Sequence, residues 1–126
     1  MIKVLVVDDD VSVCKSLVGF LEDSNFEVAS VSSGEEALVL AIKEYFDVAI
    51  VDLRLPEISG DALILKAHQL VPGLRFIIHT GSVGYRLSDE LKQIGLLPAH
   101  VFMKPMDDLN ELVEGIKKLV TGEEEE

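Results

Sequence analysis

The chain has 126 residues, of which 48% are apolar, and a formal net charge of −12. This composition excludes a disordered chain and indicates one α/β domain with a well-filled core. The charge is still −8 without the four glutamates at the C-terminus, which disfavours direct binding to nucleic acid or to anionic membranes.

Cys14 is the only cysteine, so an intrachain disulfide is impossible. We expect a small, buried hydrophobic side chain there, in a reducing compartment. The N-terminus leads directly into an apolar strand and lacks the features of a signal peptide. No apolar run reaches the roughly twenty residues that span a bilayer. We therefore expect a cytoplasmic protein with no membrane segment.

Apolar, strand-like runs alternate with amphipathic, helical patterns about five times along the chain. The expected strands cover residues 2–7, 26–31, 47–53, 74–80 and 100–103. A first helix is expected around Cys14, Leu17, Val18 and Leu21, and further helices at residues 33–45, 61–70, 87–94 and 109–120. This alternation predicts right-handed βαβ units and a central parallel sheet. We expect one domain over residues 1–121, followed by an acidic tail or the start of a linker at 122–126.

Two of the expected helices carry signals for their ends. Ser33 with Glu36, and Asp108 with Glu111, have the spacing of a capping box, in which two side chains satisfy the first free N–H groups of a helix. Gly122 follows the last apolar position of the final helix, and glycine is the common residue just after a helix end.

Charged or hydroxyl-bearing side chains follow four of the five expected strands, and ligands of such sheets bind beyond the carboxyl ends of the strands. These side chains are Asp8, Asp9 and Asp10, then Asp52, Thr80 and Lys104. Two carboxylates about 5 Å apart repel by roughly 3 kcal/mol at an effective dielectric near 20, so one lysine cannot offset three carboxylates. A bound divalent cation can, and an all-oxygen site suits Mg²⁺, or alternatively Mn²⁺.

With these residues at these separations, the chain resembles the receiver domain of bacterial two-component response regulators, over residues 2–120. The resemblance implies a three-layer, doubly wound, flavodoxin-like α/β fold, with strand order 2-1-3-4-5 and helices on both faces. It implies that Asp52 takes a phosphoryl group from a phosphohistidine on a sensor histidine kinase or a histidine phosphotransfer protein. The chain would catalyse its own phosphorylation and slow dephosphorylation, chiefly as a switch that acts on a downstream protein.

The resemblance also assigns the metal ligands. Asp9 would bind Mg²⁺ directly and Asp8 largely through water, while Asp52 and the backbone carbonyl of Arg54 would complete the protein ligands. Asp10 is expected to cap the following helix.

Around the phosphoryl group, the resemblance implies that Lys104 pairs with its oxygens and that the Thr80 hydroxyl moves to hydrogen-bond one of them. The Lys104–Pro105 peptide is expected to be cis. Gly81 would leave backbone room beside the phosphate. Ser82 and Arg54 would border the site, and we expect them to set the lifetime of the phosphoaspartate.

The chain departs from the family between Gly95 and Lys104, where the connection is about two residues longer than usual. Many members carry an aromatic residue three positions before the lysine, where this chain has Val101. Strand alternation places Phe102 on the opposite face, in the core. The switch region is therefore expected to be altered.

Dimerisation that depends on phosphorylation is an open possibility, and Tyr85 is either an output-face residue or plain surface.

Two other functions are compatible with parts of the sequence. A haloacid-dehalogenase-type phosphatase would use Asp8 as nucleophile and Asp10 as acid/base, but Asp107 and Asp108 follow the lysine too closely for that family's second acidic pair. A pseudo-receiver would keep the fold and take no phosphate, an alternative that rests only on the altered switch position. Asp52 discriminates between the first alternative and the receiver, because only the receiver needs it.

The three histidines, His68, His79 and His100, are scattered along the chain. None lies at metal-ligand spacing from another, so we expect each to be structural or exposed and not catalytic. No further chemistry is predicted from them.

Overall fold

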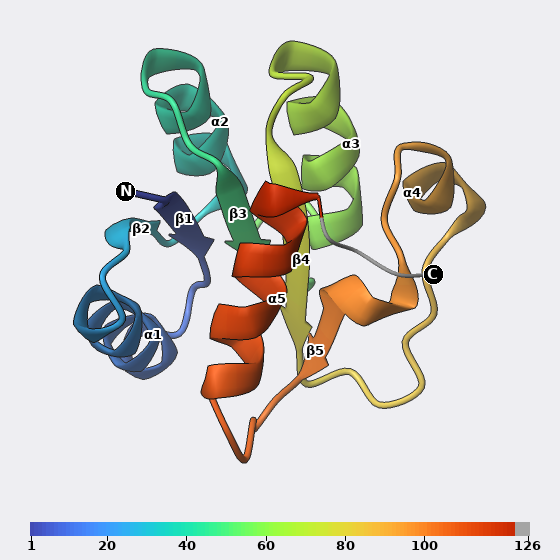
Figure 1. The fold of residues 1–126 in the computed structure, drawn as a ribbon. Coiled ribbons are helices and arrows are strands. Elements are labelled where there is room, and N and C mark those ends of the chain that lie inside the picture. The colour runs from blue at the N-terminus through green and yellow to red at the C-terminus, as the bar shows by residue number, and fades with distance from the viewer. Residues whose placement is uncertain (123–126) are drawn as a thin grey trace.

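In a computed structural model that describes residues 1–122, five parallel strands form one central sheet in the order β2-β1-β3-β4-β5 (Figure 1). The strands are β1 (Lys3–Val7), β2 (Glu27–Val31), β3 (Val48–Val51), β4 (Arg75–Thr80) and β5 (Val101–Met103). This confirms the expected fold class and strand order. It also places β1, β3 and β4 in the middle of the sheet, each hydrogen-bonded on both sides.

Helices cover both faces of the sheet and complete three layers. They are α1 (Val11–Asp23), α2 (Gly34–Lys43), α3 (Gly60–Leu70), α4 (Asp89–Gln93) and α5 (Asn110–Thr121), with a short 3₁₀ helix, η1 (Pro98–His100). Apolar side chains of α1 and α5 pack on one face, and those of α2, α3 and α4 pack on the other. In Figure 1, α5 runs across the front of the sheet, beside β4 and β5.

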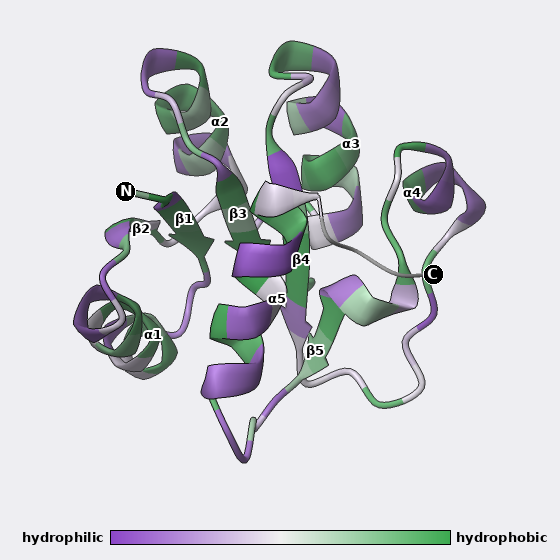
Figure 2. Ribbon diagram, in the orientation of Figure 1, coloured by the Kyte–Doolittle hydropathy of each residue, from purple (hydrophilic) through white to green (hydrophobic). Residues whose placement is uncertain are grey.

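Successive residues of the central strands supply the two cores in turn. Leu5 and Val7 belong to the core under α2, α3 and α4, whereas Val4 and Val6 belong to the core under α1 and α5. Figure 2 shows the consequence: β3 is green, β4 combines green with purple stretches, and the helices are banded in both colours. Because both faces of the sheet are covered, β3 and the part of β1 after Lys3 are continuous apolar runs that do not alternate with polar residues.

Local side-chain hydrogen bonds define where helices begin. Asp10 caps α1 as expected, because its Oδ1 accepts the N–H groups of Ser12 and Val13 at 2.9 and 3.2 Å. At α2, Ser33 accepts the N–H of Glu36 at 3.2 Å, and the Ser33 hydroxyl donates to the Glu36 carboxylate. The predicted cap at the start of α2 is confirmed, although Glu36 bonds the hydroxyl of Ser33 and not its backbone.

The capping box predicted for the last helix is wrong. α5 begins at Asn110 with Leu109 in the capping position, already in helical conformation and without a side-chain cap. Asp108 instead accepts the N–H of Asn110 at 3.0 Å, two residues on, which is the local turn that aspartate commonly forms. The expected C-terminal signal is confirmed, because Gly122 ends α5 with φ of 77°.

Other element boundaries differ from expectation by a few residues. α4 covers only Asp89–Gln93, because Ser88 caps it by accepting the N–H of Leu91 at 3.2 Å. In the longer connection before β5, residues Pro98–His100 form η1, so His100 does not belong to the strand. Of the acidic tail expected at 122–126, residues 123–126 lie outside the described residues. Within 1–122, no helix combines the length and apolar character needed to cross a bilayer.

At Gly60, its first residue, α3 comes into close contact with the end of β3, and a substitution can test this contact. A Cβ atom at this position would lie 2.5 Å from the carbonyl oxygen of Asp52 and 2.7 Å from the Cα of Leu53. Because these neighbours are backbone atoms that cannot rotate away, we expect Gly60→Ala to lower the free energy of unfolding by about 2 kcal/mol. Urea denaturation measures the change.

Gly19 supplies the matched control. It lies inside α1, and a Cβ there would have no neighbour within 4 Å. Gly19→Ala is therefore expected to raise the free energy of unfolding by about 0.5–1 kcal/mol, through helix propensity alone. Equal effects of the two substitutions would contradict the close approach at Gly60.

Candidate functional site

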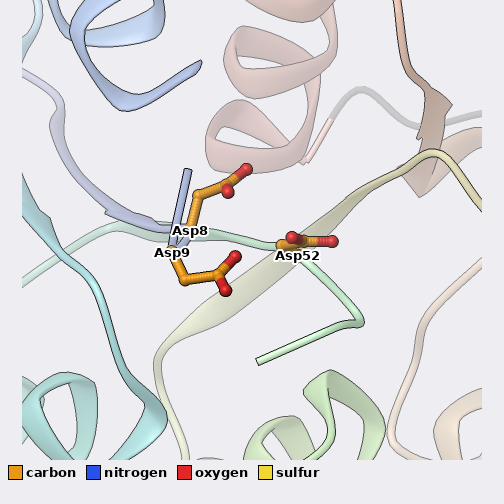
Figure 3. Close-up of side chains that lie close together, drawn as sticks. All are labelled: Asp8, Asp9 and Asp52. Carbon is orange, nitrogen blue, oxygen red and sulfur yellow. The ribbon is translucent and has the colours of Figure 1, made fainter. Parts of the chain in front are cut away.

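The ends of β1 and β3 bring three carboxylates together, as the sequence predicted. One carboxylate oxygen from each of Asp8, Asp9 and Asp52 lies within 4.8 Å of the other two (Figure 3). The parallel pairing of β1 and β3 aligns these ends, and the Asp52 N–H donates to the carbonyl of Val7 at 2.9 Å. Asp8 and Asp52 are buried, and Asp9 is exposed.

Lys104 reaches this cluster from the end of β5. Its Nζ lies 2.7 Å from Asp8 Oδ2 and 3.3 Å from Asp52 Oδ2. The Lys104 N–H also donates to the carbonyl of Thr80 at 2.7 Å, which fixes the lysine beside the end of β4. Burial lowers the pKa of the ammonium, but the hydrogen bond and charge of Asp8, followed by those of Asp52, outweigh burial. The pKa of Lys104 is therefore raised, and the side chain is cationic at neutral pH.

The carboxyl group of Asp52 has an unusual environment. Burial raises its pKa, and the Arg54 N–H at 3.3 Å and the charge of Lys104 only partly counteract that effect. Asp8 has a protein partner on each oxygen, because Oδ1 accepts the N–H of Asp10 at 2.9 Å and Oδ2 accepts from Lys104. Three carboxylates thus lie together beside one lysine, which contacts Asp8 and Asp52, and they provide oxygen donors of the kind that a hard divalent cation prefers.

Thr80 and Gly81 occupy the places that the sequence indicated, at the end of β4. Thr80 is fully buried, and its hydroxyl accepts the N–H of Ser82 at 3.0 Å. A Cβ on Gly81 would meet only the Cβ of Lys104, at 3.9 Å, so the backbone here has open space beside it. The Lys104–Pro105 peptide is cis, which confirms that expectation.

The two residues of the expected switch region face opposite cores. Val101 packs on the side of α3 and α4, and Phe102 on the side of α1 and α5. The Phe102 ring lies so close to α5 that a Cβ on Gly115 would be 2.8 Å from its Cζ. Phe102 lies on the expected face, where it is partly buried and packs against the core, and no aromatic side chain of β5 lies on the Val101 face.

For three residues near the site, the sequence predicted the burial incorrectly or did not predict the position in the fold. Cys14 is only half-buried, and its thiol donates to the Asp8 carbonyl at 3.1 Å; burial raises its pKa. Tyr85 donates its hydroxyl to Asp61 at 2.9 Å, a contact between residues 24 positions apart that no local pattern indicates. His79 is buried in β4, and strand alternation with Ile77 is the signal that could have placed it under α1 and α5.

Comparison with known proteins agrees with this geometry. The sequence model of the family described as the response regulator receiver domain matches residues 4–117. The chain belongs to this family. The match favours the receiver over the phosphatase alternative. The geometry agrees, because residues at the ends of four strands contribute to one site, as the receiver resemblance requires.

Relatives of this receiver domain include longer proteins. A response regulator receiver protein from Anaeromyxobacter is 33% identical over 84% of this chain and 44% of the relative. The transcriptional regulatory protein ZraR from Salmonella typhimurium is 32% identical over 93% of this chain and 26% of the relative. The chain therefore spans less than half of the length of these curated relatives.

Solved structures share the fold over nearly the full chain. A receiver domain from Methanospirillum hungatei superposes with a TM-score of 0.80 and 31% identity, covering 97% of this chain and 95% of that one. The response regulator TrrA from Thermotoga maritima, determined in complex with Mg²⁺ and BeF, has a TM-score of 0.82 and 26% identity, covering 94% and 99%.

His79 makes the stability of the receiver domain depend on pH. Burial, assisted by the charge of Lys104, lowers the pKa of His79 from 6.5 to about 4. The unfolded chain therefore binds this proton more tightly than the folded chain does, and stability is lost as the pH falls from about 6.5 towards 4. Over the interval from pH 7 to about 4.5, we expect His79 to account for a loss of about 2 kcal/mol.

His79→Gln isolates this contribution, because every other titrating group is common to both proteins. We expect the free energy of unfolding to fall less steeply with acidification in the variant, as measured by urea denaturation at each pH. Parallel curves for parent and variant would contradict the burial of a neutral imidazole.

Proposed function

We propose that this receiver domain is a phosphoacceptor of two-component signalling, and that Asp52 accepts the phosphoryl group. The donor is a phosphohistidine on a sensor histidine kinase or a histidine phosphotransfer protein. One observation carries the proposal: the buried Asp52 carboxylate lies beside Lys104 and two further aspartates at the carboxyl edge of the sheet. The phosphorylated domain then acts as a conformational or interaction switch.

The chemistry at Asp52 follows from its surroundings. A carboxylate oxygen forms the new bond to phosphorus as the phosphorus–nitrogen bond breaks, and the electron pair of that bond stays on the imidazole of the donor. Such transfer depends chiefly on positioning and on stabilising the charge of the transferred group. Lys104, which bridges Asp8 and Asp52 at 2.7 and 3.3 Å, is placed to pair with phosphoryl oxygens. The Thr80 hydroxyl would hydrogen-bond another of them.

The acidic cluster fits Mg²⁺, with Mn²⁺ as a substitute. Asp9 and Asp52 would bind the ion directly, Asp8 through water, and the carbonyl of Arg54 would complete the set. This division agrees with burial, because both oxygens of Asp8 already have protein partners and Asp9 is exposed. When bound, Mg²⁺ neutralises the oxygens of the transferred group. The complex of the Thermotoga maritima relative with Mg²⁺ and BeF supports the assignment.

The biological setting is part of the proposal. We infer that residues 1–121 form the receiver domain and that the net charge of −12 keeps it from contacting DNA directly. Because the chain covers about a quarter of a transcriptional regulator such as ZraR, an output on DNA would come from another domain or protein. A cytoplasmic location fits the phosphohistidine donor.

Intact mass after incubation with acetyl phosphate tests the proposal. We expect the parent chain to gain one phosphoryl group in Mg²⁺ and none in EDTA, and Asp52→Asn to gain none. A gain that survives Asp52→Asn would show that another residue is the acceptor. Mg²⁺ binding without any gain, from acetyl phosphate or from a phosphorylated kinase, would instead support the pseudo-receiver.

Arg54 and Ser82 border the same site and are expected to control loss of the phosphoryl group. Arg54 is exposed beside Asp52, where its side chain can shield the acyl phosphate from water. We expect Arg54→Ala to release phosphate severalfold faster than the parent, in a time course of intact mass after the donor is removed. Ser82→Ala is predicted to change the same rate, and rates equal to that of the parent in both variants would contradict this role.

A further inference from the structure

Tyr85 joins two loops that both border the site. It lies in the segment 81–88 between β4 and α4, and its hydroxyl donates to Asp61 Oδ1 at 2.9 Å. Asp61 lies in the first turn of α3, and both side chains are half-buried. Burial, followed by the hydrogen bond to Asp61, raises the pKa of Tyr85. The hydroxyl therefore keeps the proton that it donates.

On one side, this contact leads to Asp52. Asp61 follows Gly60, whose N–H donates to the carbonyl of Leu53 at 2.9 Å. The Cα of Gly60 lies so close to the preceding strand end that an added Cβ would be 2.5 Å from the Asp52 carbonyl oxygen. The start of α3 is thus packed directly against the peptide group of Asp52, the proposed phosphoacceptor. Asp61, the next residue of the helix, is therefore positioned relative to that peptide group.

On the other side, the contact leads to Thr80. The N–H of Tyr85 donates to the carbonyl of Ser82 at 3.3 Å, and the N–H of Ser82 donates to the Thr80 hydroxyl at 3.0 Å. Two hydrogen bonds in series therefore connect Tyr85 to the hydroxyl that is expected to move on phosphorylation. The Tyr85 side chain also packs against the same core as Val101, on the face where β5 carries no aromatic residue.

We propose that Tyr85 is a positioning residue that ties the segment 81–88 to α3 and holds the Thr80 hydroxyl on Ser82. The inference rests on the proposed function. Movement of the Thr80 hydroxyl towards a phosphoryl group on Asp52 would displace Ser82 and, through it, strain the hydrogen bond between Tyr85 and Asp61. The hydrogen bond between Tyr85 and Asp61 thus favours the unphosphorylated arrangement, and its strength sets how readily the site accepts the group.

Tyr85→Phe tests the proposal in the full chain, because it removes the hydroxyl and keeps the ring. Tyr45→Phe is the matched control: its hydroxyl also donates to an aspartate, Asp47, at 2.9 Å, but it lies 71% exposed at the opposite edge of the sheet. We expect Tyr85→Phe to take up the phosphoryl group from acetyl phosphate about fivefold faster, the size that the net contribution of one hydrogen bond allows. Tyr45→Phe is expected to match the parent.

A second readout needs no phosphorylation. Hydrogen–deuterium exchange of the amides in segment 81–88 is expected to be faster in Tyr85→Phe than in the parent, and unchanged in Tyr45→Phe. Asp61→Ala should have the same two effects as Tyr85→Phe, and the double variant should add nothing further. Asp61→Asn keeps an acceptor oxygen and is expected to restore slow exchange and slow uptake, a rescue that lost packing alone would not produce.

The outcomes separate this inference from the proposed function. Unchanged amide exchange in Tyr85→Phe would contradict the claim that Tyr85 holds segment 81–88 to α3. Faster exchange with unchanged phosphoryl uptake would contradict the claim that this hydrogen bond influences the site. Only the comparison of uptake requires that the parent chain is phosphorylated on Asp52. If the parent gains no phosphoryl group, the proposed function fails and the influence on uptake fails with it. Exchange of segment 81–88 in the unphosphorylated protein then decides the tie by itself.

Discussion

The arrangement of Asp8, Asp9 and Asp52 around one ammonium group is the interaction on which the rest of this structure depends. Carboxylates at this separation repel, and burial of Asp8 and Asp52 strengthens the repulsion. The fold holds them together because β1 and β3 pair in parallel, and because backbone N–H groups and Lys104 satisfy the buried oxygens. The excess of negative charge that remains makes this cluster suited to a cation.

The same constraint shapes the loops around the cleft. Gly60 allows α3 to approach the strand end that carries Asp52, and the backbone N–H of Lys104 bonds the carbonyl of Thr80. Backbone contacts and short hydrogen bonds therefore join neighbouring loops at the site. In this receiver domain the Val101 face of β5 has no aromatic side chain, and Tyr85 contacts Asp61 at the start of α3.

The sequence was informative wherever the signal was local. Continuous apolar runs between helical patterns predicted the sheet, and Asp10 predicted the start of α1, because a cap depends only on residues a few positions away. The site residues were also predictable, since the carboxyl ends of parallel strands share one edge. The errors at helix starts arose where two local patterns competed: Asp108 bonds the N–H two residues on and does not cap α5, and α4 begins later because Ser88 caps it.

The sequence by itself therefore determined the class of fold, the edge of the sheet at which chemistry occurs, and the residue types present there. The tertiary structure alone decided which atoms meet: Lys104 bridging Asp8 and Asp52, His79 buried without its charge, and Tyr85 bonded to Asp61. The physical reason is that periodicity and capping act over a few residues of one segment. Hydrogen bonds and burial between distant segments depend on how the helices pack against the sheet, and no single stretch of sequence encodes that packing.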